Sequence, residues 1–187
     1  MTWRERVFGS SRRITVKSPL IIRSPRIGFL NLLGEPAQSM LEEDKAALGP
    51  LFSGLAVSDA SPPVCDVLLI YARVEDDGRI AGTADGLRDL IKAGGPIAIV
   101  ATANASKSLI AAGKSADYGQ ANLVLTLNRK GTAFARFFSE LFGKMFRGTT
   151  MPLAWVELAP QTSAARHDNC PYALFLAEIS HILFQTA

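Results

Sequence analysis

Polar side chains that could do chemistry follow a series of short apolar runs in this 187-residue sequence. In a parallel sheet the carboxyl ends of the strands share one edge, and ligands bind there near the point where strand order reverses. The groups are Asn31 and Glu35; Arg73, Glu75, Asp76 and Asp77; Thr102, Asn104 and Ser106; Asn128 and Arg129; and Glu157 and Gln161. We take Arg73, Thr102, Asn104 and Asn128 as candidate ligand-binding residues. The alternative interpretation is that they are ordinary polar loop residues in water.

Two further motifs could hold a metal ion or a phosphate. The acidic run Glu75-Asp76-Asp77 offers carboxylate oxygens of the kind that Mg²⁺ takes, although acids next to Gly78 are also typical of a solvated turn. The run Gly113-Lys114-Ser115 has the order found at the end of a phosphate-binding loop, but Ser108 stands where that motif needs glycine. We therefore expect no metal ion and no bound cofactor.

The cysteines and histidines are few. His167 and Cys170 lie three residues apart, but a thiolate nucleophile also needs an oxyanion site, and Pro171 indicates a plain turn. His181 stands among apolar residues, which favours a core or interface position. Two cysteines form no disulfide framework, and no apolar run approaches the roughly 20 residues that cross a bilayer. We expect a cytoplasmic protein, with membrane-peripheral binding as an alternative.

The apolar runs alternate with helical patterns, which predicts the elements that would position these residues. Strands are expected at 27–33, 64–71, 97–100, 123–127 and 153–158. Helices are expected at 40–52 with Ser39 as the cap, from Thr83 through Ile91, around 109–112 and at 134–146; the segment 172–185 reads as a last helix or the start of a strand. Apolar strands alternating with helices indicate a parallel sheet covered on both faces. The prediction is a single three-layer α/β domain over 27–187, with a mostly parallel, five-stranded, flavodoxin-like sheet and a C-terminal extension.

The helix at 134–146 carries an apolar stripe that is wider than one sheet face usually needs. Its members recur at helical spacing: Phe134, Phe137, Phe138, Leu141, Phe142, Met145 and Phe146. One interpretation is core that covers the sheet. The other is a docking surface for a protein partner or a second copy of the chain, for which the candidate interface residues are Phe134, Phe138, Phe142 and Phe146.

The first 26 residues form a basic arm. They hold seven basic side chains and one acidic side chain, a net charge of +6, whereas the remaining thirteen basic and sixteen acidic side chains give −3. An arm of this charge could meet an acidic protein, anionic lipid or nucleic acid, and its Arg- and Ser-rich composition also fits a transit peptide. A basic leader lying along the domain is the simpler alternative.

Two stretches resemble the receiver domains of response regulators. The run 86–91 followed by 96–103 is similar to the helix and the Thr-Ala strand end of that family. Leu33-Gly34-Glu35-Pro36 falls where a receiver has its acidic pair, Tyr71 occupies the phosphoacceptor position, and no lysine stands within the fourth strand. The resemblance implies a pseudo-receiver, a non-catalytic signalling or scaffolding domain that acts through protein contacts.

A second stretch, 66–76, resembles the opening box of TIR domains. That resemblance implies cleavage of a nucleotide such as NAD, with Glu140 as the catalytic carboxylate. In an enzyme of this kind that uses the strand-end loops, we expect Arg73 and Asn104 to contact the substrate. The sequence departs from the TIR pattern because the strand at 27–33 precedes the box. Non-catalytic protein contact is our first expectation, and NAD hydrolysis and peripheral binding through the basic arm are the alternatives.

Overall fold

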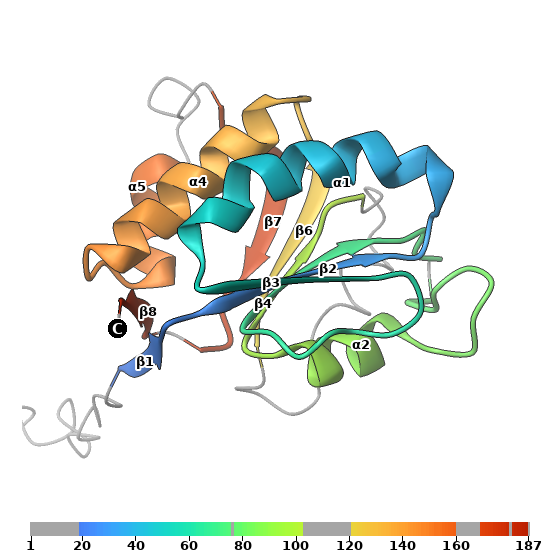
Figure 1. The fold of residues 1–187 in the computed structure, drawn as a ribbon, viewed down its shortest axis with the longest axis horizontal. Helices are drawn as coiled ribbons and strands as arrows, with labels where there is room; N and C mark the ends of the chain where they lie inside the picture. The colour runs from blue at the N-terminus through green and yellow to red at the C-terminus, as the bar shows by residue number, and fades with distance from the viewer. Residues whose placement is uncertain (1–18, 76, 103–120, 160–168, 180, 187) are drawn as a thin grey trace, which may run out of the picture.

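The computed structural model describes residues 19–75, 77–102, 121–159, 169–179 and 181–186. These residues form an α/β fold around a six-stranded sheet in the order β3-β2-β4-β5-β6-β7 (Figure 1). The strands are β2 (Arg26–Asn31), β3 (Gly54–Ser58), β4 (Val67–Tyr71), β5 (Ile97–Val100), β6 (Asn122–Asn128) and β7 (Tyr172–Leu176). All neighbours pair in parallel except β6 and β7, so the sheet is mostly parallel with one antiparallel edge strand.

Helices cover both faces of this sheet. Three helices, α1 (Glu35–Leu48), α4 (Ala133–Phe146) and α5 (Met151–Leu158), lie on one face, and α2 (Leu87–Gly94) lies on the other (Figure 1). A short 3-10 turn, η2 (Gly49–Leu51), follows α1. All five residues of β4 and all four of β5 are buried, which explains why these strands read as unbroken apolar runs.

A second, two-stranded sheet lies beside the main one. Its strands β1 (Leu20–Arg23) and β8 (Ile182–Gln185) pair in parallel, and Ile22 and Phe184 turn into the core under α4. The strand β1 belongs to the predicted basic arm, of which residues 1–18 lie outside the described part of the chain. Within the described ranges, no helix combines the length and the apolar character needed to cross a membrane.

The connection between β3 and β4 crosses β2 as a loop, without a helix, through residues 59–66. It passes so close to the sheet that a Cβ at Gly28 would lie 2.7 Å from Cys65 Sγ and 2.8 Å from Pro63 Cγ. Glycine at this position therefore allows the loop to cover the strand where a helix would otherwise lie.

The predicted α/β class and mostly parallel sheet are confirmed, as are strands near 27–33, 64–71, 97–100 and 123–127 and the helix at 134–146. The strand predicted at 153–158 is wrong: this segment is α5, with Pro152 in its first turn and Thr150 extended before it. The first helix begins at Glu35, so Ser39 lies inside it and is not its cap. The interpretation of 172–185 as a helix is also wrong, because the segment forms β7 and β8. The piece around 109–112 lies outside the described residues.

Candidate functional site

Three polar side chains from distant parts of the sequence meet at the carboxyl edge of the sheet. The hydroxyl of Tyr71, the last residue of β4, donates a hydrogen bond of 2.5 Å to Asp44 Oδ2 on α1. Arg129, just after β6, donates to both oxygens of the same carboxylate, at 2.9 Å and 3.0 Å. The Arg129 guanidinium also lies 4.0 Å from the centre of the Phe134 ring. We call Tyr71, Asp44 and Arg129 the edge cluster.

Burial makes the members of the edge cluster dependent on one another. Asp44 and Tyr71 have 0% of their surface exposed, and the Arg129 side chain has 12%. Burial raises the pKa of Tyr71 strongly, the negative charge of Asp44 raises it further, and the hydroxyl therefore stays protonated and donates. A buried carboxylate is stable only if it is paired, and the two-pronged contact from Arg129 supplies that charge. The edge cluster is thus a closed set of polar contacts rather than an open reactive group.

The structure brings Asn31, Thr102 and Asn128 to the same edge, as predicted, and each side chain binds nearby backbone. Asn31 Nδ2 donates to Gly34 O at 2.9 Å. Thr102 Oγ1 donates to Ala72 O at 2.7 Å and accepts from Ala72 N at 3.1 Å, which ties the ends of β4 and β5 together. Asn128 Oδ1 accepts from Lys130 N at 3.0 Å. These contacts hold the turns that follow the strands.

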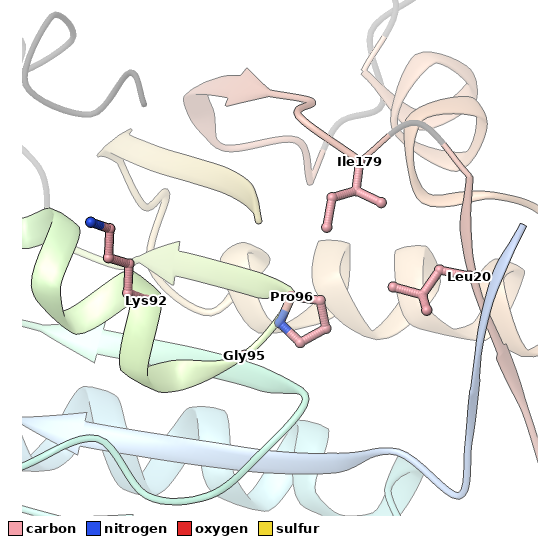
Figure 2. A pocket seen from close by; sticks show the side chains of 5 residues that line it. All are labelled: Leu20, Lys92, Gly95, Pro96 and Ile179. Carbon is pink, nitrogen blue, oxygen red and sulfur yellow. The ribbon is translucent and has the colours of Figure 1, made fainter. Parts of the chain in front are cut away.

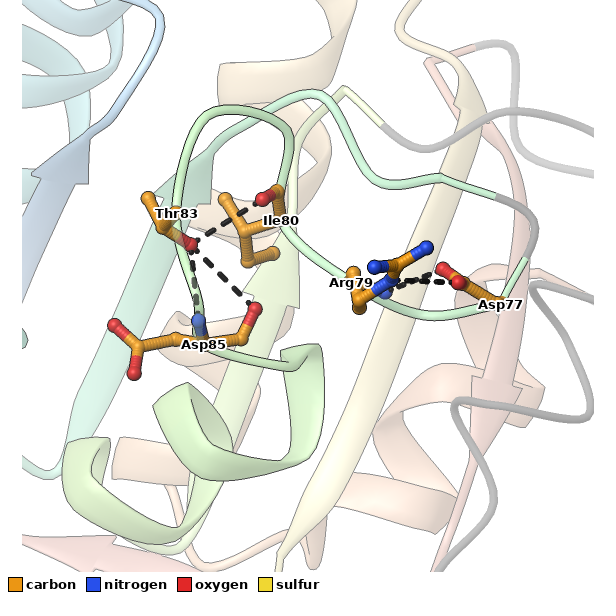
Figure 3. Close-up of polar contacts among 5 residues, drawn as sticks. All are labelled: Asp77, Arg79, Ile80, Thr83 and Asp85. Carbon is orange, nitrogen blue, oxygen red and sulfur yellow. Dashed lines mark hydrogen bonds and ion pairs between the residues drawn. The ribbon is translucent and has the colours of Figure 1, made fainter.

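Arg73 lies just after β4, at the start of the loop that leads to α2. Figure 3 shows the part of this loop from Asp77 to Asp85, which turns back on itself. The Arg73 side chain is 71% exposed and pairs with Glu75 at 3.3 Å. Further along, Arg79 pairs with Asp77 at 2.6 Å, and hydrogen bonds from the Arg79 backbone and side chain lower the pKa of Asp77. Thr83 Oγ1 donates to Ile80 O and accepts from Asp85 N, both at 3.2 Å. Asp77, one of the acids considered for Mg²⁺, therefore already has a cationic partner, and Asp76 lies outside the described residues.

Two of the open hollows that the described residues form lie at opposite ends of the strands. The one at the carboxyl edge has a volume of about 310 Å³ and lies between α1 and the ends of β2 and β3; its lining is Asn31, Gln38, Leu41, Val57, Ser58 and Asp59. The other, at the amino ends, has a volume of about 480 Å³ and is lined by Leu20, Lys92, Gly95, Pro96 and Ile179 (Figure 2). Neither lining includes Arg73 or Glu140, the residues expected to enclose a nucleotide.

Glu140 lies on the exposed side of α4, while its neighbours Phe137, Phe138 and Leu141 face the core. Glu157, expected after a strand, lies instead on α5 and pairs with Lys144 at 2.7 Å. Asn104, the third member of the nucleotide-binding hypothesis, lies outside the described residues, as do Ser106, Gln161, His167 and the run 113–115. The described residues therefore place Arg73 in an exposed loop and Glu140 on the outer surface of a helix.

The phenylalanine stripe of α4 is core. Phe134, Phe138 and Phe142 are completely buried, and Phe146 is partly buried. Phe142 packs edge-on against Phe52 at 5.3 Å between ring centres, and Phe146 lies 5.0 Å from Phe184. The part of the stripe that the sheet does not cover packs against η2, β8 and α5, which lie beside the sheet. A partner would therefore have to bind a surface other than these rings.

The sulfur and imidazole groups also have structural surroundings. Cys65 Sγ donates to Gly94 O at 3.2 Å, and burial, followed by the nearby charge of Asp66, raises the pKa of this thiol to about 11. Cys170 is buried, and His181 is half-buried next to β8. Among the described residues, no group of three or more histidines, cysteines and carboxylates is placed to hold a metal ion.

Asp44 is the member of the edge cluster that sequence reasoning missed. It lies between Leu41 and Leu48 on the buried face of α1. An acidic residue on the apolar stripe of a helix is rarely buried unless it is paired. The position of Asp44 in the sequence therefore indicates a buried, paired carboxylate. Its partner Arg129 is 85 residues away in the sequence, and nothing local identifies it.

Comparisons of this chain with protein-family models, with curated proteins and with solved structures found no match. The resemblances to receiver and TIR domains therefore remain predictions.

Proposed function

We propose that this chain is a non-catalytic domain that acts through protein contacts, built on a flavodoxin-like sheet and related in design to a pseudo-receiver. In chain order, the five parallel strands of the main sheet lie in the order 2-1-3-4-5, with β7 added at one edge. A flavodoxin-like sheet has that order, and its ligand site lies at the carboxyl ends of the first and third strands.

The edge cluster is the observation that carries this proposal. The third strand of the main sheet in chain order, after β2 and β3, is β4. It ends in Tyr71, whose hydroxyl is buried and donates a hydrogen bond to Asp44. Arg129 occupies both oxygens of the Asp44 carboxylate. An enzyme or phosphoacceptor needs a reactive group that a substrate can reach, whereas these groups satisfy one another out of contact with water. The strand end at which a flavodoxin-like sheet binds its ligand thus holds α1, the residue after β6 and the end of β4 together.

Two alternatives have less support from the described residues. NAD hydrolysis through Glu140 would need this exposed carboxylate to join Arg73 around a substrate, but Glu140 lies on the outer side of α4, Arg73 pairs with Glu75 in the loop after β4, and neither lines the two hollows described above. Peripheral binding through the basic arm depends mainly on residues 1–18, and salt-sensitive binding of the full chain to vesicles of anionic lipid would support it.

The experiment is to incubate the full chain separately with NAD and with acetyl phosphate plus Mg²⁺, and to follow NAD by chromatography and the protein by intact mass. We expect unchanged NAD and an unchanged protein mass, for the chain and for Glu140→Gln alike. Loss of NAD that disappears in Glu140→Gln would replace our proposal with the hydrolase alternative. A phosphorylated protein would show that the chain is not a degenerate receiver.

A second experiment tests directly for protein contacts. The folded chain is cross-linked in cells that express it, and the cross-linked proteins are identified by mass spectrometry. We expect cross-links from the domain surface to a protein, either another chain or a second copy. A domain that cross-links to no protein under conditions that capture known complexes would contradict a protein-contact function.

A further inference from the structure

Among the residues that the structure describes, the strand β3 pairs only with β2 and forms an edge of the main sheet. Alternate backbone N–H and C=O groups of β3 therefore face away from β2. Natural edge strands are commonly protected by lysine, proline or a bulge, yet Gly54–Ser58 contains no charged residue and no proline. Leu55 and Val57 remain 42% and 51% exposed on this strand.

From this edge we infer that β3 pairs with β3 of a second copy of the chain, antiparallel and about a two-fold axis at Ala56, which joins two main sheets into one. This inference rests on the proposed function and names the partner and the surface.

The sequence of β3 is complementary to itself in that arrangement. Antiparallel pairing centred on Ala56 places Leu55 of one copy opposite Val57 of the other, twice, and Gly54 opposite Ser58. Both large side chains lie on the α1 face, since Leu55 touches the position of Gly49 and Val57 lines the hollow with Leu41. Directly opposite apolar side chains on one face are the pairs that stabilise antiparallel strands. Pairing would therefore cover the two most exposed apolar residues of the edge at once.

The charges next to β3 favour the antiparallel orientation. Asp59 follows the strand, and the Arg26 side chain lies beside its first residue, since a Cβ at Gly54 would be 3.2 Å from Arg26 Nε. Two-fold pairing brings Asp59 of one copy to the Gly54 end of β3 in the other copy, where Arg26 of the neighbouring strand β2 lies. Parallel pairing in register would instead put the two Asp59 side chains next to each other. The charge pattern thus selects one orientation of the two strands.

The first test measures the mass of the full chain by sedimentation over a range of concentrations. We expect the mass to rise from 20.1 kDa towards twice that value. Val57→Lys places a lysine in the edge and should raise the dissociation constant at least about tenfold. Val156→Lys is the matched control, because Val156 is a similarly exposed valine, at 62%, on α5 rather than on β3.

The second test fixes the register by disulfide trapping. Leu55→Cys mixed with differently tagged Val57→Cys should form mixed disulfides, because these positions are directly opposite in the inferred pair. Either variant alone should form few, since identical positions are then diagonal neighbours about 7–8 Å apart, beyond ordinary disulfide geometry. Equal trapping in the two single-variant samples and in the mixture would contradict this register.

The outcomes separate this inference from the proposed function. A single-chain mass at all concentrations overturns the β3 pairing, while cross-links to another protein would still support a protein-contact domain. A dimer weakened equally by Val57→Lys and Val156→Lys, or by neither, overturns the pairing and leaves self-association through another surface. Consumption of NAD overturns the proposed function whatever the oligomeric state.

Discussion

Two sets of opposite charges at the carboxyl edge of the sheet differ in almost every physical respect. In the edge cluster, Asp44 and Arg129 are buried and doubly bonded, and they join segments 85 residues apart. In the loop before α2, Asp77 and Arg79 are two residues apart and exposed, and they pair across a local turn (Figure 3). The residue types are the same in the two regions. Because the first pair is buried, the loss of either partner would leave an unpaired charge away from water, whereas the second pair is exposed and each of its charges is hydrated.

The largest effect should come from removing the cation of the edge cluster. Arg129→Met leaves the Asp44 carboxylate buried without a charged partner, and we expect a loss of about 3–5 kcal/mol of unfolding free energy in urea. The double variant Asp44→Leu with Arg129→Met removes both charges and should recover a large part of that loss. A single variant as stable as the parent chain would show that the cluster is not needed for stability.

A smaller effect is expected from Tyr71→Phe, which deletes one hydrogen bond to a carboxylate that Arg129 still holds. The expected cost near neutral pH is about 1.5–3 kcal/mol. The pKa of Tyr71 is raised in the folded protein, so above about pH 10 the unfolded chain loses this proton while the folded chain keeps it. Stability therefore falls as the pH rises, by up to about 1.4 kcal/mol per pH unit from this group.

The difference in unfolding free energy between the parent chain and Tyr71→Phe should consequently become smaller above about pH 10. Cys65 is present in both proteins, so its own alkaline titration cancels in the difference. Urea unfolding at several pH values between 8 and 11 would measure this, with those limits chosen about the ordinary tyrosine pKa near 10. A difference in stability that stays constant over that range would mean that the hydroxyl is not held protonated by the fold.

The smallest effect should come from the exposed loop. Arg79→Ala breaks the pair with Asp77, yet we expect no measurable change in the urea midpoint at moderate salt, because both side chains are hydrated. The pKa of Asp77 is lowered, so any contribution is present at neutral pH and disappears as acid protonates the carboxylate. A loss comparable to that of Arg129→Met would overturn the contrast between the two regions.

The sequence predicted the elements whose pattern is local and strong. The runs that form β4, β5 and β6 are apolar throughout, and α4 carries a regular helical stripe. Prediction failed where the local pattern was ambiguous. Leu153–Val156 reads as a strand until Pro152, a good first-turn residue, is considered. The strand β3 was missed because an edge strand is half-exposed and gives a weak pattern over only five residues.

The candidate site was less predictable than the fold. The strands predicted from the sequence correctly place four of the polar residues at or just after the carboxyl ends of strands: Asn31, Arg73, Thr102 and Asn128. What these side chains do there depends on tertiary contacts: Thr102 binds the backbone of Ala72, 30 residues away, and the Arg73 side chain is exposed in its loop. The width of the phenylalanine stripe was visible in the sequence, but the elements that cover it, η2 and β8, come from distant segments.

The pairing of β1 with β8 has a consequence for the order of events during synthesis. Leu20 pairs with Ile182, so β1 leaves the ribosome long before its partner exists. Until β8 is made, Ile22 and the buried face of α4 lack their contact with Phe184, whose ring centre lies 5.9 Å from that of Phe142 in the folded protein. Contacts of such long sequence separation form late and slowly. The β2-to-β6 sheet can assemble before β8 has been synthesised, whereas the corner closed by β1 and β8 forms only once β8 has left the ribosome, and its apolar side chains stay uncovered until then.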